Sequence, residues 1–157
     1  MNRSWIEVNL GQLKSNVRSL CDSIPAQVIF VVKADAYGHG MVPIARAAAE
    51  EGVGWFAVAY LEEALRLNET LPDAKILVLG YVFPESVESL IGRKIIPIVT
   101  DREHGLALAA AARALGKTLP VHLKVDTGMG RFGVQWDEIE ETMQAFNQAG
   151  GLELVGV

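Results

Sequence analysis

Short apolar segments alternate with longer amphipathic segments along most of the chain. The short segments are rich in β-branched residues and predict strands at residues 28–32, 55–58, 75–79, 95–99, 121–125 and 152–157. The longer segments predict helices at residues 10–21, 41–51, 61–67, 84–91, 101–115 and 137–149. Strands that alternate with helices are typical of parallel βαβ units, so the sequence predicts an α/β fold.

Local features add four expectations to this pattern. Trp5–Asn9 has the composition of a further, leading strand. The uninterrupted apolar run at residues 28–32 predicts a strand that is covered on both faces. Pro97 lacks a ladder donor, so we expect its strand to pair on either side of it. Thr100 or Asp101 is expected to cap the helix that follows.

The number of strands bears on the topology. About six βα units are predicted after the leading strand, whereas a closed TIM-type (β/α)8 barrel typically has about 250 residues. The chain is therefore either an open, doubly wound sheet or a TIM-type barrel truncated to about six units. No linker or low-complexity segment divides residues 1–157, so we interpret them as one partial domain.

Composition narrows the classes of partner. The net charge is −5, from 14 basic and 19 acidic residues, and no basic block is present, which disfavours nucleic acid and anionic membranes as partners. The single cysteine, Cys21, is interpreted as a small buried residue of the first helix, and it suits a reducing compartment. We find no metal-binding cluster, membrane span or signal peptide, and expect a cytoplasmic protein.

The segment Val31–Gly40 carries the first candidate chemistry. Lys33 directly follows a predicted buried strand, and parallel folds place ligands at the carboxyl ends of their strands. A partly desolvated amine there is a nucleophile toward an aldehyde. The alternative is that Lys33 is simply the first solvated residue after the strand. Tyr37 offers a hydroxyl group to a phosphate, and His39 is interpreted as an ordinary loop histidine.

The segment Lys124–Gly133 also follows a predicted strand, and its three glycines allow tight turns beside a ligand. The planar guanidinium of Arg131 suits a carboxylate or phenolate oxygen. The alternatives are that Asp126 caps a turn and that Arg131 forms a surface ion pair.

Together the two segments resemble the signatures of alanine racemase, a fold-type III family of pyridoxal-phosphate enzymes. The cofactor-lysine motif lies at Val31–Gly40, and the motif Lys-Val-Asp-Thr-Gly-Met-Gly-Arg-Phe-Gly lies at Lys124–Gly133. The resemblance covers essentially the whole chain, including Trp5–Val8, although Asp35 stands where the family often has asparagine. It implies most of the N-terminal barrel domain, without the family's C-terminal β domain.

The resemblance also implies roles for individual residues. Lys33 would hold pyridoxal 5'-phosphate as an internal aldimine and act as the base on one face of the substrate, and Tyr37 would contact the phosphate. Arg131 would contact the cofactor's phenolic oxygen and the substrate carboxylate, oriented by Lys124, which is carbamylated in many members. The second base would be a tyrosine of the partner subunit in a homodimer.

The implied activity is the interconversion of L-alanine and D-alanine for peptidoglycan synthesis. We expect the 157-residue chain alone to have little activity, since inversion needs two opposed bases. Two alternatives remain open: a serine or broad-specificity racemase of the same fold, and a non-catalytic pyridoxal-phosphate carrier.

Overall fold

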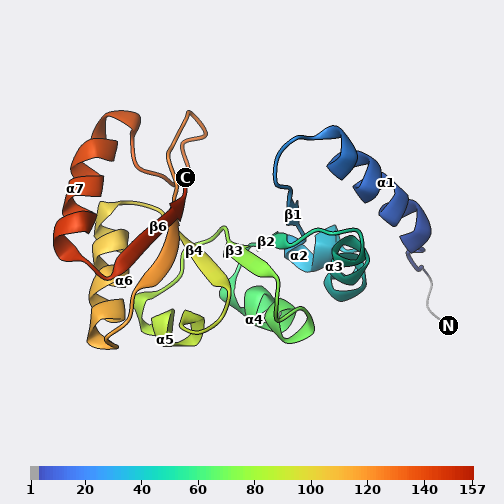
Figure 1. Ribbon diagram of the computed structural model, residues 1–157, viewed down its shortest axis with the longest axis horizontal. Helices are drawn as coiled ribbons and strands as arrows, with labels where there is room; N and C mark the ends of the chain where they lie inside the picture. The colour runs from blue at the N-terminus through green and yellow to red at the C-terminus, as the bar shows by residue number, and fades with distance from the viewer. Residues whose placement is uncertain (1–3) are drawn as a thin grey trace.

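A computed structural model of the protein describes residues 4–157, in which six parallel strands form one sheet (Figure 1). The strands are β1 (Ile29–Val31), β2 (Trp55–Val58), β3 (Lys75–Val78), β4 (Ile95–Val99), β5 (Leu119–Leu123) and β6 (Leu152–Gly156). The helices are α1 (Leu10–Ser23), α2 (Lys33–Tyr37), α3 (Met41–Glu50), α4 (Leu61–Thr70), α5 (Val87–Leu90), α6 (Arg102–Ala114) and α7 (Ile139–Ala149). Two 3-10 turns, η1 (Pro84–Ser86) and η2 (Trp136–Glu138), precede α5 and α7.

The strand order decides between the two predicted topologies. Each strand pairs in parallel with the next one along the chain, from β1 to β6. A doubly wound sheet would reverse this order at a switch point. The sequential order is that of a TIM-type barrel, which confirms the barrel prediction and excludes the open, doubly wound alternative.

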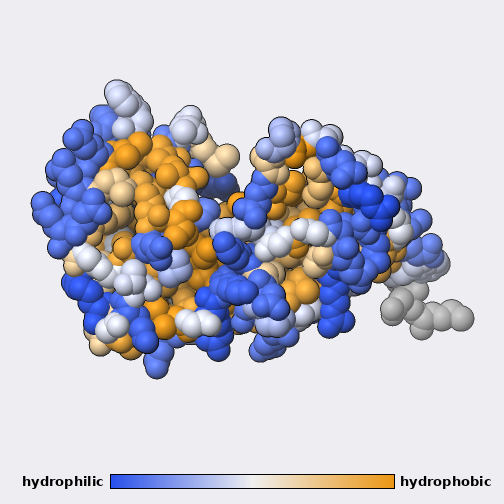
Figure 2. Space-filling view, in the orientation of Figure 1, coloured by the Kyte–Doolittle hydropathy of each residue, from blue (hydrophilic) through white to orange (hydrophobic). Residues whose placement is uncertain are grey.

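Two apolar clusters cover the two faces of the sheet. The larger lies between the strands and the helices, and its fully buried members include Phe56, Leu67 and Leu108. The smaller lies on the opposite face and is built from Trp55, Ala57, Leu77, Ile96 and Ile98. Figure 2 shows hydrophobic residues gathered where β4 to β6 lie. The strands β2, β3 and β4 are therefore packed on both faces, as expected for parallel sheets.

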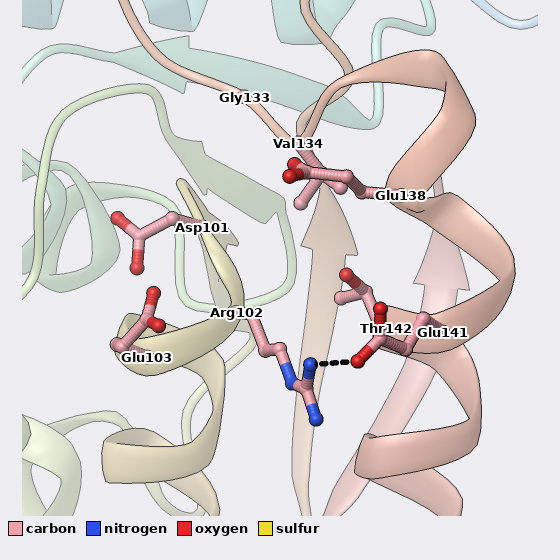
Figure 3. Close-up of a pocket in the computed structure, with 8 residues that line it drawn as sticks. All are labelled: Asp101, Arg102, Glu103, Gly133, Val134, Glu138, Glu141 and Thr142. Carbon is pink, nitrogen blue, oxygen red and sulfur yellow. Dashed lines mark hydrogen bonds and ion pairs between the residues drawn. The ribbon is translucent and has the colours of Figure 1, made fainter.

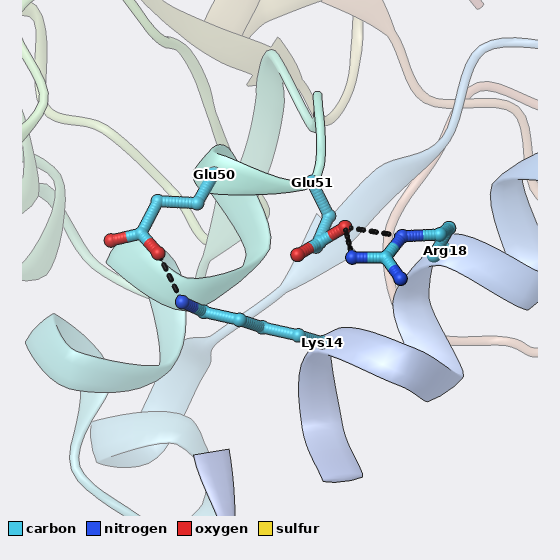
Figure 4. A network of polar contacts seen from close by, with 4 residues as sticks. All are labelled: Lys14, Arg18, Glu50 and Glu51. Atoms are coloured by element: carbon cyan, nitrogen blue, oxygen red, sulfur yellow. Dashed lines mark hydrogen bonds and ion pairs between the residues drawn. The ribbon is translucent and has the colours of Figure 1, made fainter. Parts of the chain in front are cut away.

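The first helix packs on the third through charged as well as apolar groups. Lys14 and Arg18 of α1 form ion pairs with Glu50 and Glu51 at the end of α3 (Figure 4). Arg18 Nε and Nη2 lie 2.9 and 2.8 Å from Glu51 Oε2. Val17 is buried between these pairs and the core, so α1 is fixed against the barrel wall.

Two predictions for the N-terminal part are wrong. Residues 5–9 form no strand, and Trp5 and Ile6 are exposed, because no strand among the described residues lies beside them to complete a ladder. Instead, Asn9 caps α1 by accepting a hydrogen bond from Gln12 N at 2.9 Å. The strand expected to be covered on both faces lies at the edge of the sheet, since among residues 4–157 β1 pairs with β2 alone, and Ile29 and Val31 are 39% exposed.

Three other details concern β4 to α6. Pro97 lies within β4, which pairs with β3 as far as Pro97 and with β5 from Ile98 onward, as predicted. β5 lies two residues earlier than predicted, so Lys124 follows the strand instead of lying within it. Of the two predicted caps of α6, Asp101 is the one observed. No helix in residues 4–157 combines the length and apolarity needed to cross a bilayer.

Candidate active site

Lys33 lies at the carboxyl end of β1 and is half-buried. The four residues that follow it, from Ala34 to Tyr37, all have positive φ, between 51° and 56°. This left-handed backbone disfavours each non-glycine residue by about 1–2 kcal/mol. Such a turn persists only where the surrounding contacts hold it, and strained segments of this kind concentrate at functional sites.

Hydrogen bonds from three directions hold the turn. Within it, Ala36 N donates to Val32 O at 2.9 Å. On its outer side, Asp35 Oδ1 accepts from Met41 N at 2.8 Å and so joins the turn to the start of α3. Toward β2, Ala34 N donates to Glu63 Oε1 at 2.7 Å. The turn after Lys33 is therefore bonded both to α3 of its own βα unit and to α4 of the next unit.

His39 and Tyr37 differ in their surroundings. His39 Nδ1 donates to Ala36 O at 2.8 Å, so the ring helps to close the turn, in agreement with its interpretation as a loop histidine. Tyr37 is 61% exposed, and the space around Gly38 is open. The hydroxyl of Tyr37 is accessible to a ligand.

A second loop follows β5 and carries Arg131. Its first half is a turn closed by Asp126, whose carboxylate accepts hydrogen bonds of 3.0 Å from Gly128 N and Gly130 N. These amide donors, led by that of Gly130, lower the pKa of Asp126 below its ordinary value. The turn-capping alternative for Asp126 is thus the one observed.

The two ends of this loop meet at its base. Val134 N donates to Lys124 O at 2.8 Å, and Asp126 N donates to Val134 O at 3.0 Å. Gly133 has φ +122°, and a Cβ atom there would lie 2.5 Å from Asp126 N. Only glycine fits this close approach, so the residue type at position 133 determines how the Arg131 loop closes.

The predicted site residues share one edge of the sheet, but among residues 4–157 no hydrogen bond or ion pair joins Lys33, Lys124 and Arg131 to one another. Lys33 follows β1 and Lys124 follows β5, and parallel strands present their carboxyl ends to the same side. Lys124 Nζ donates to Val125 O at 2.9 Å, and Arg131 Nη2 lies 3.0 Å from Met129 Sδ. Within residues 4–157, neither Lys33 nor Arg131 forms an ion pair, so the surface-pair alternative for Arg131 is not observed.

A buried histidine joins the loops after β3 and β4. His104 Nε2 donates to Val82 O at 2.8 Å, and its Nδ1 accepts from Thr100 N at 3.2 Å. These bonds define a neutral ring with the proton on Nε2, stacked on Tyr81 at a centroid distance of 4.0 Å. Burial lowers the pKa of His104, against the opposing effects of Val82 O and Asp101.

A cavity of about 190 Å³ opens beside this edge, between α6 and α7 (Figure 3). It is mainly acidic, and its one basic residue, Arg102, is paired with Glu141. The lining residues are Asp101, Arg102, Glu103, Gly133, Val134, Glu138, Glu141 and Thr142. Carboxylates disfavour an anionic ligand, so this cavity does not suit the phosphate or carboxylate groups that Arg131 would bind.

Sequence reasoning missed Glu63. It is the third residue of α4, and its Oε2 accepts from Ala59 N at 2.8 Å and from the N-cap amide of Tyr60 at 3.3 Å. A glutamate three residues after the N-cap is half of a capping box, and this spacing was the available signal. The additional bond to Ala34 spans 29 residues and has no local signature.

These features define a class of protein. It is a TIM-type parallel βα barrel domain whose candidate site lies at the carboxyl ends of the strands, with a lysine after β1 and an arginine loop after β5. The chain matches the family described as alanine racemase, N-terminal domain, over residues 8–157. The chain belongs to this family.

Individual relatives agree with this assignment. The alanine racemase of Carboxydothermus hydrogenoformans is 44% identical over 142 residues, which are 90% of this chain and 39% of that protein. The crystal structure of alanine racemase from Bacillus anthracis with bound L-Ala-P has a TM-score of 0.87 and 34% identity, over 100% of this chain and 41% of its own. Alanine racemase from Bartonella henselae with covalently bound pyridoxal phosphate has a TM-score of 0.81 and 28% identity, over 92% and 43%. The chain thus spans about two fifths of the length of these relatives.

Proposed function

We propose that residues 1–157 are part of the pyridoxal-phosphate-binding barrel domain of a racemase that interconverts L-alanine and D-alanine. The observation that carries the proposal is the position of Lys33, which is half-buried at the carboxyl end of β1 and begins a left-handed turn. The relative from Bartonella henselae, with covalently bound pyridoxal phosphate, and the one from Bacillus anthracis, with bound L-Ala-P, support the cofactor and the substrate class.

The residues present fit the cofactor. The amine of Lys33 forms no ion pair with another residue of 4–157, which leaves it available to condense with an aldehyde. Tyr37 presents an exposed hydroxyl on the same turn for the phosphate. Among residues 4–157 no carboxylate pairs with Arg131, and its Nε and Nη1 make no hydrogen bond, so they are free to donate to the phenolic oxygen of the cofactor or the substrate carboxylate. When bound, the cofactor withdraws electron density from the substrate Cα and so lowers the barrier to loss of its proton.

We assign roles to the chain's own groups from the family resemblance. Lys33 holds the cofactor and moves a proton on one face of the Cα, while Arg131 orients the carboxylate and Lys124 positions Arg131. Inversion needs a second base on the opposite face, which we assign to a tyrosine of the partner subunit. The working protein is accordingly a cytoplasmic homodimer that supplies D-alanine for peptidoglycan, an assignment supported by membership of the family.

Chemical trapping tests the central assignment. The protein is incubated with pyridoxal phosphate, reduced with borohydride, digested and analysed by mass spectrometry, with K33A as a parallel sample. The label is expected on Lys33 and on no other residue, and it should be lost in K33A. A label on Lys124 or another lysine, in material shown to be folded, contradicts the proposal.

Substrate identity requires a separate measurement. We expect kcat/KM of the full-length protein to be highest for alanine among alanine, serine and bulkier amino acids. A higher value for serine would support the broad-specificity alternative, and firm cofactor binding without any racemisation would support the carrier alternative.

A further inference from the structure

One carboxylate, that of Glu63, joins the lysine turn to the neighbouring βα unit. Its Oε1 accepts from Ala34 N at 2.7 Å, and its Oε2 accepts from Ala59 N at 2.8 Å. We propose that Glu63 is a positioning residue that holds the turn after Lys33 in its left-handed form and thereby directs the Lys33 amine. This inference rests on the function proposed for Lys33.

The bond to Ala34 lies where the turn is least supported by its own backbone. Ala36 N and Gly38 N donate within the turn, to Val32 O and Ala34 O, but Ala34 N is bonded to the Glu63 side chain. A hydrogen bond to an ionised acceptor is about twice as strong as a neutral one. Glu63 therefore supplies a strong bond to the first residue of a backbone that is intrinsically disfavoured.

The two carboxylate oxygens of Glu63 accept hydrogen bonds from the segments that follow two different strands. Oε1 bonds the turn after β1, and Oε2 bonds the end of β2. All the groups that face the carboxylate in these bonds are N–H donors. A glutamine at this position has only one acceptor oxygen, and its NH₂ group would oppose an N–H group on the other side. The E63Q variant thus keeps the size and shape of the side chain but cannot accept hydrogen bonds from both Ala34 N and Ala59 N.

The chain supplies a matched control in Glu62. It precedes Glu63 in the first turn of α4 and is exposed, and its side chain makes no hydrogen bond within residues 4–157. E62Q makes the same change in charge at the same helix N-terminus. Differences between E63Q and E62Q therefore report the bonds of Glu63 to Ala34, Ala59 and the N-cap amide of Tyr60.

Amide hydrogen exchange tests the contact without cofactor. In the wild-type, full-length protein, Ala34 N–H is expected to exchange far more slowly than in an unstructured peptide, although Ala34 is exposed. In E63Q the exchange should be about tenfold faster or more, and in E62Q unchanged, since a hydrogen bond to a charged group is lost. Exchange of the wild-type amide at the peptide rate overturns the proposal even if E63Q does not fold.

Trapping of the cofactor tests the positioning role. The rate at which pyridoxal phosphate becomes reducible onto Lys33 is compared among wild type, E62Q and E63Q, at a temperature where all three are folded. We expect about a 10- to 100-fold slower rate in E63Q only, because small displacements of a reacting group have effects of this size. An unchanged rate in E63Q, even with a lower Tm, overturns the positioning role. Failure of the wild type to label at Lys33 would instead contradict the proposed function.

Discussion

Two glycines of the Arg131 loop allow two destabilising effects to be separated. One is the steric overlap of a Cβ atom at the base of the loop, and the other is the disfavoured backbone angle. Gly128 and Gly133 have nearly the same backbone angle, with φ of +119° and +122°. A Cβ atom at Gly128 would meet nothing within 4 Å, whereas one at Gly133 would lie 2.5 Å from Asp126 N and 2.8 Å from Val125 C. The contacting atoms belong to the backbone, so no side chain can move aside.

The expected free energies follow from this geometry. Replacing either glycine by alanine places a side chain in a disfavoured backbone region, which destabilises by about 1–3 kcal/mol. G133A adds an overlap with backbone atoms, for which overpacking values of about 1–3 kcal/mol apply. The gain from a less flexible unfolded chain is the same for both variants and cancels in the comparison. G133A should therefore be less stable than G128A by about 1–3 kcal/mol.

Urea denaturation of wild type, G128A and G133A measures these differences, provided that the three m-values agree. Racemase activity of the full-length variants adds a functional measurement, because a displaced base of the loop moves Arg131. We expect G133A to lose more of kcat/KM for alanine than G128A does. Equal losses of stability in the two variants would show that the backbone at residue 133 does not approach residues 124–126 as closely as described.

Two further predictions concern packing and pH. In α6, G105A should lower the free energy of unfolding by about 1–2 kcal/mol, because the new Cβ would overlap Phe146. In an F146L background the same change should cost less, because the shorter side chain relieves the overlap and leaves Val99 Cγ1, 3.0 Å from the new Cβ, as the remaining tight contact. Equal losses in the two backgrounds on urea denaturation would refute the overlap with Phe146. Burial lowers the pKa of His104 below 6.5, so the unfolded chain takes up the proton at higher pH. The stabilisation of the folded protein by neutral His104 is complete above pH 6.5, and it is lost as the pH falls from there through the lowered pKa. The fall in Tm between about pH 7 and about pH 5 should be smaller in H104Q, with a remainder from His122, whose pKa burial also lowers. Parallel curves of Tm against pH for wild type and H104Q would contradict this role of His104.

The barrel topology was accessible from the sequence because its determinants are local and periodic. Apolar runs and amphipathic helices alternate regularly, and each strand pairs with the next one along the chain. The prediction of a leading strand was wrong because the composition of Trp5–Asn9 indicates β-propensity but not the presence of a partner strand. The strand β5 was predicted two residues too late, because Leu119 and Pro120 pair with Leu152 and Glu153 and so belong to its start.

The candidate site was predictable in part. Lys33 and Arg131 could be found because each follows a strand end, and a strand end fixes the side of the sheet on which a residue lies. The left-handed turn could not, since Ala34, Ala36 and Tyr37 are residue types that disfavour positive φ. That conformation is imposed by bonds from other elements, and those bonds come from residues that are distant in sequence.

Neighbouring loops at the carboxyl edge are joined in pairs. Glu63 connects the loops after β1 and β2, His104 connects those after β3 and β4, and Gly133 N donates to Thr100 O at 2.8 Å between the loops after β4 and β5. Within residues 4–157 no hydrogen bond or ion pair joins Lys33 to Arg131, so their relative position depends on these intervening contacts and on the sheet beneath them. Each contact is shared by only two loops. The Lys33 turn and the Arg131 loop are consequently held by different residues. A substitution that displaces one loop can therefore leave the conformation of the other unchanged.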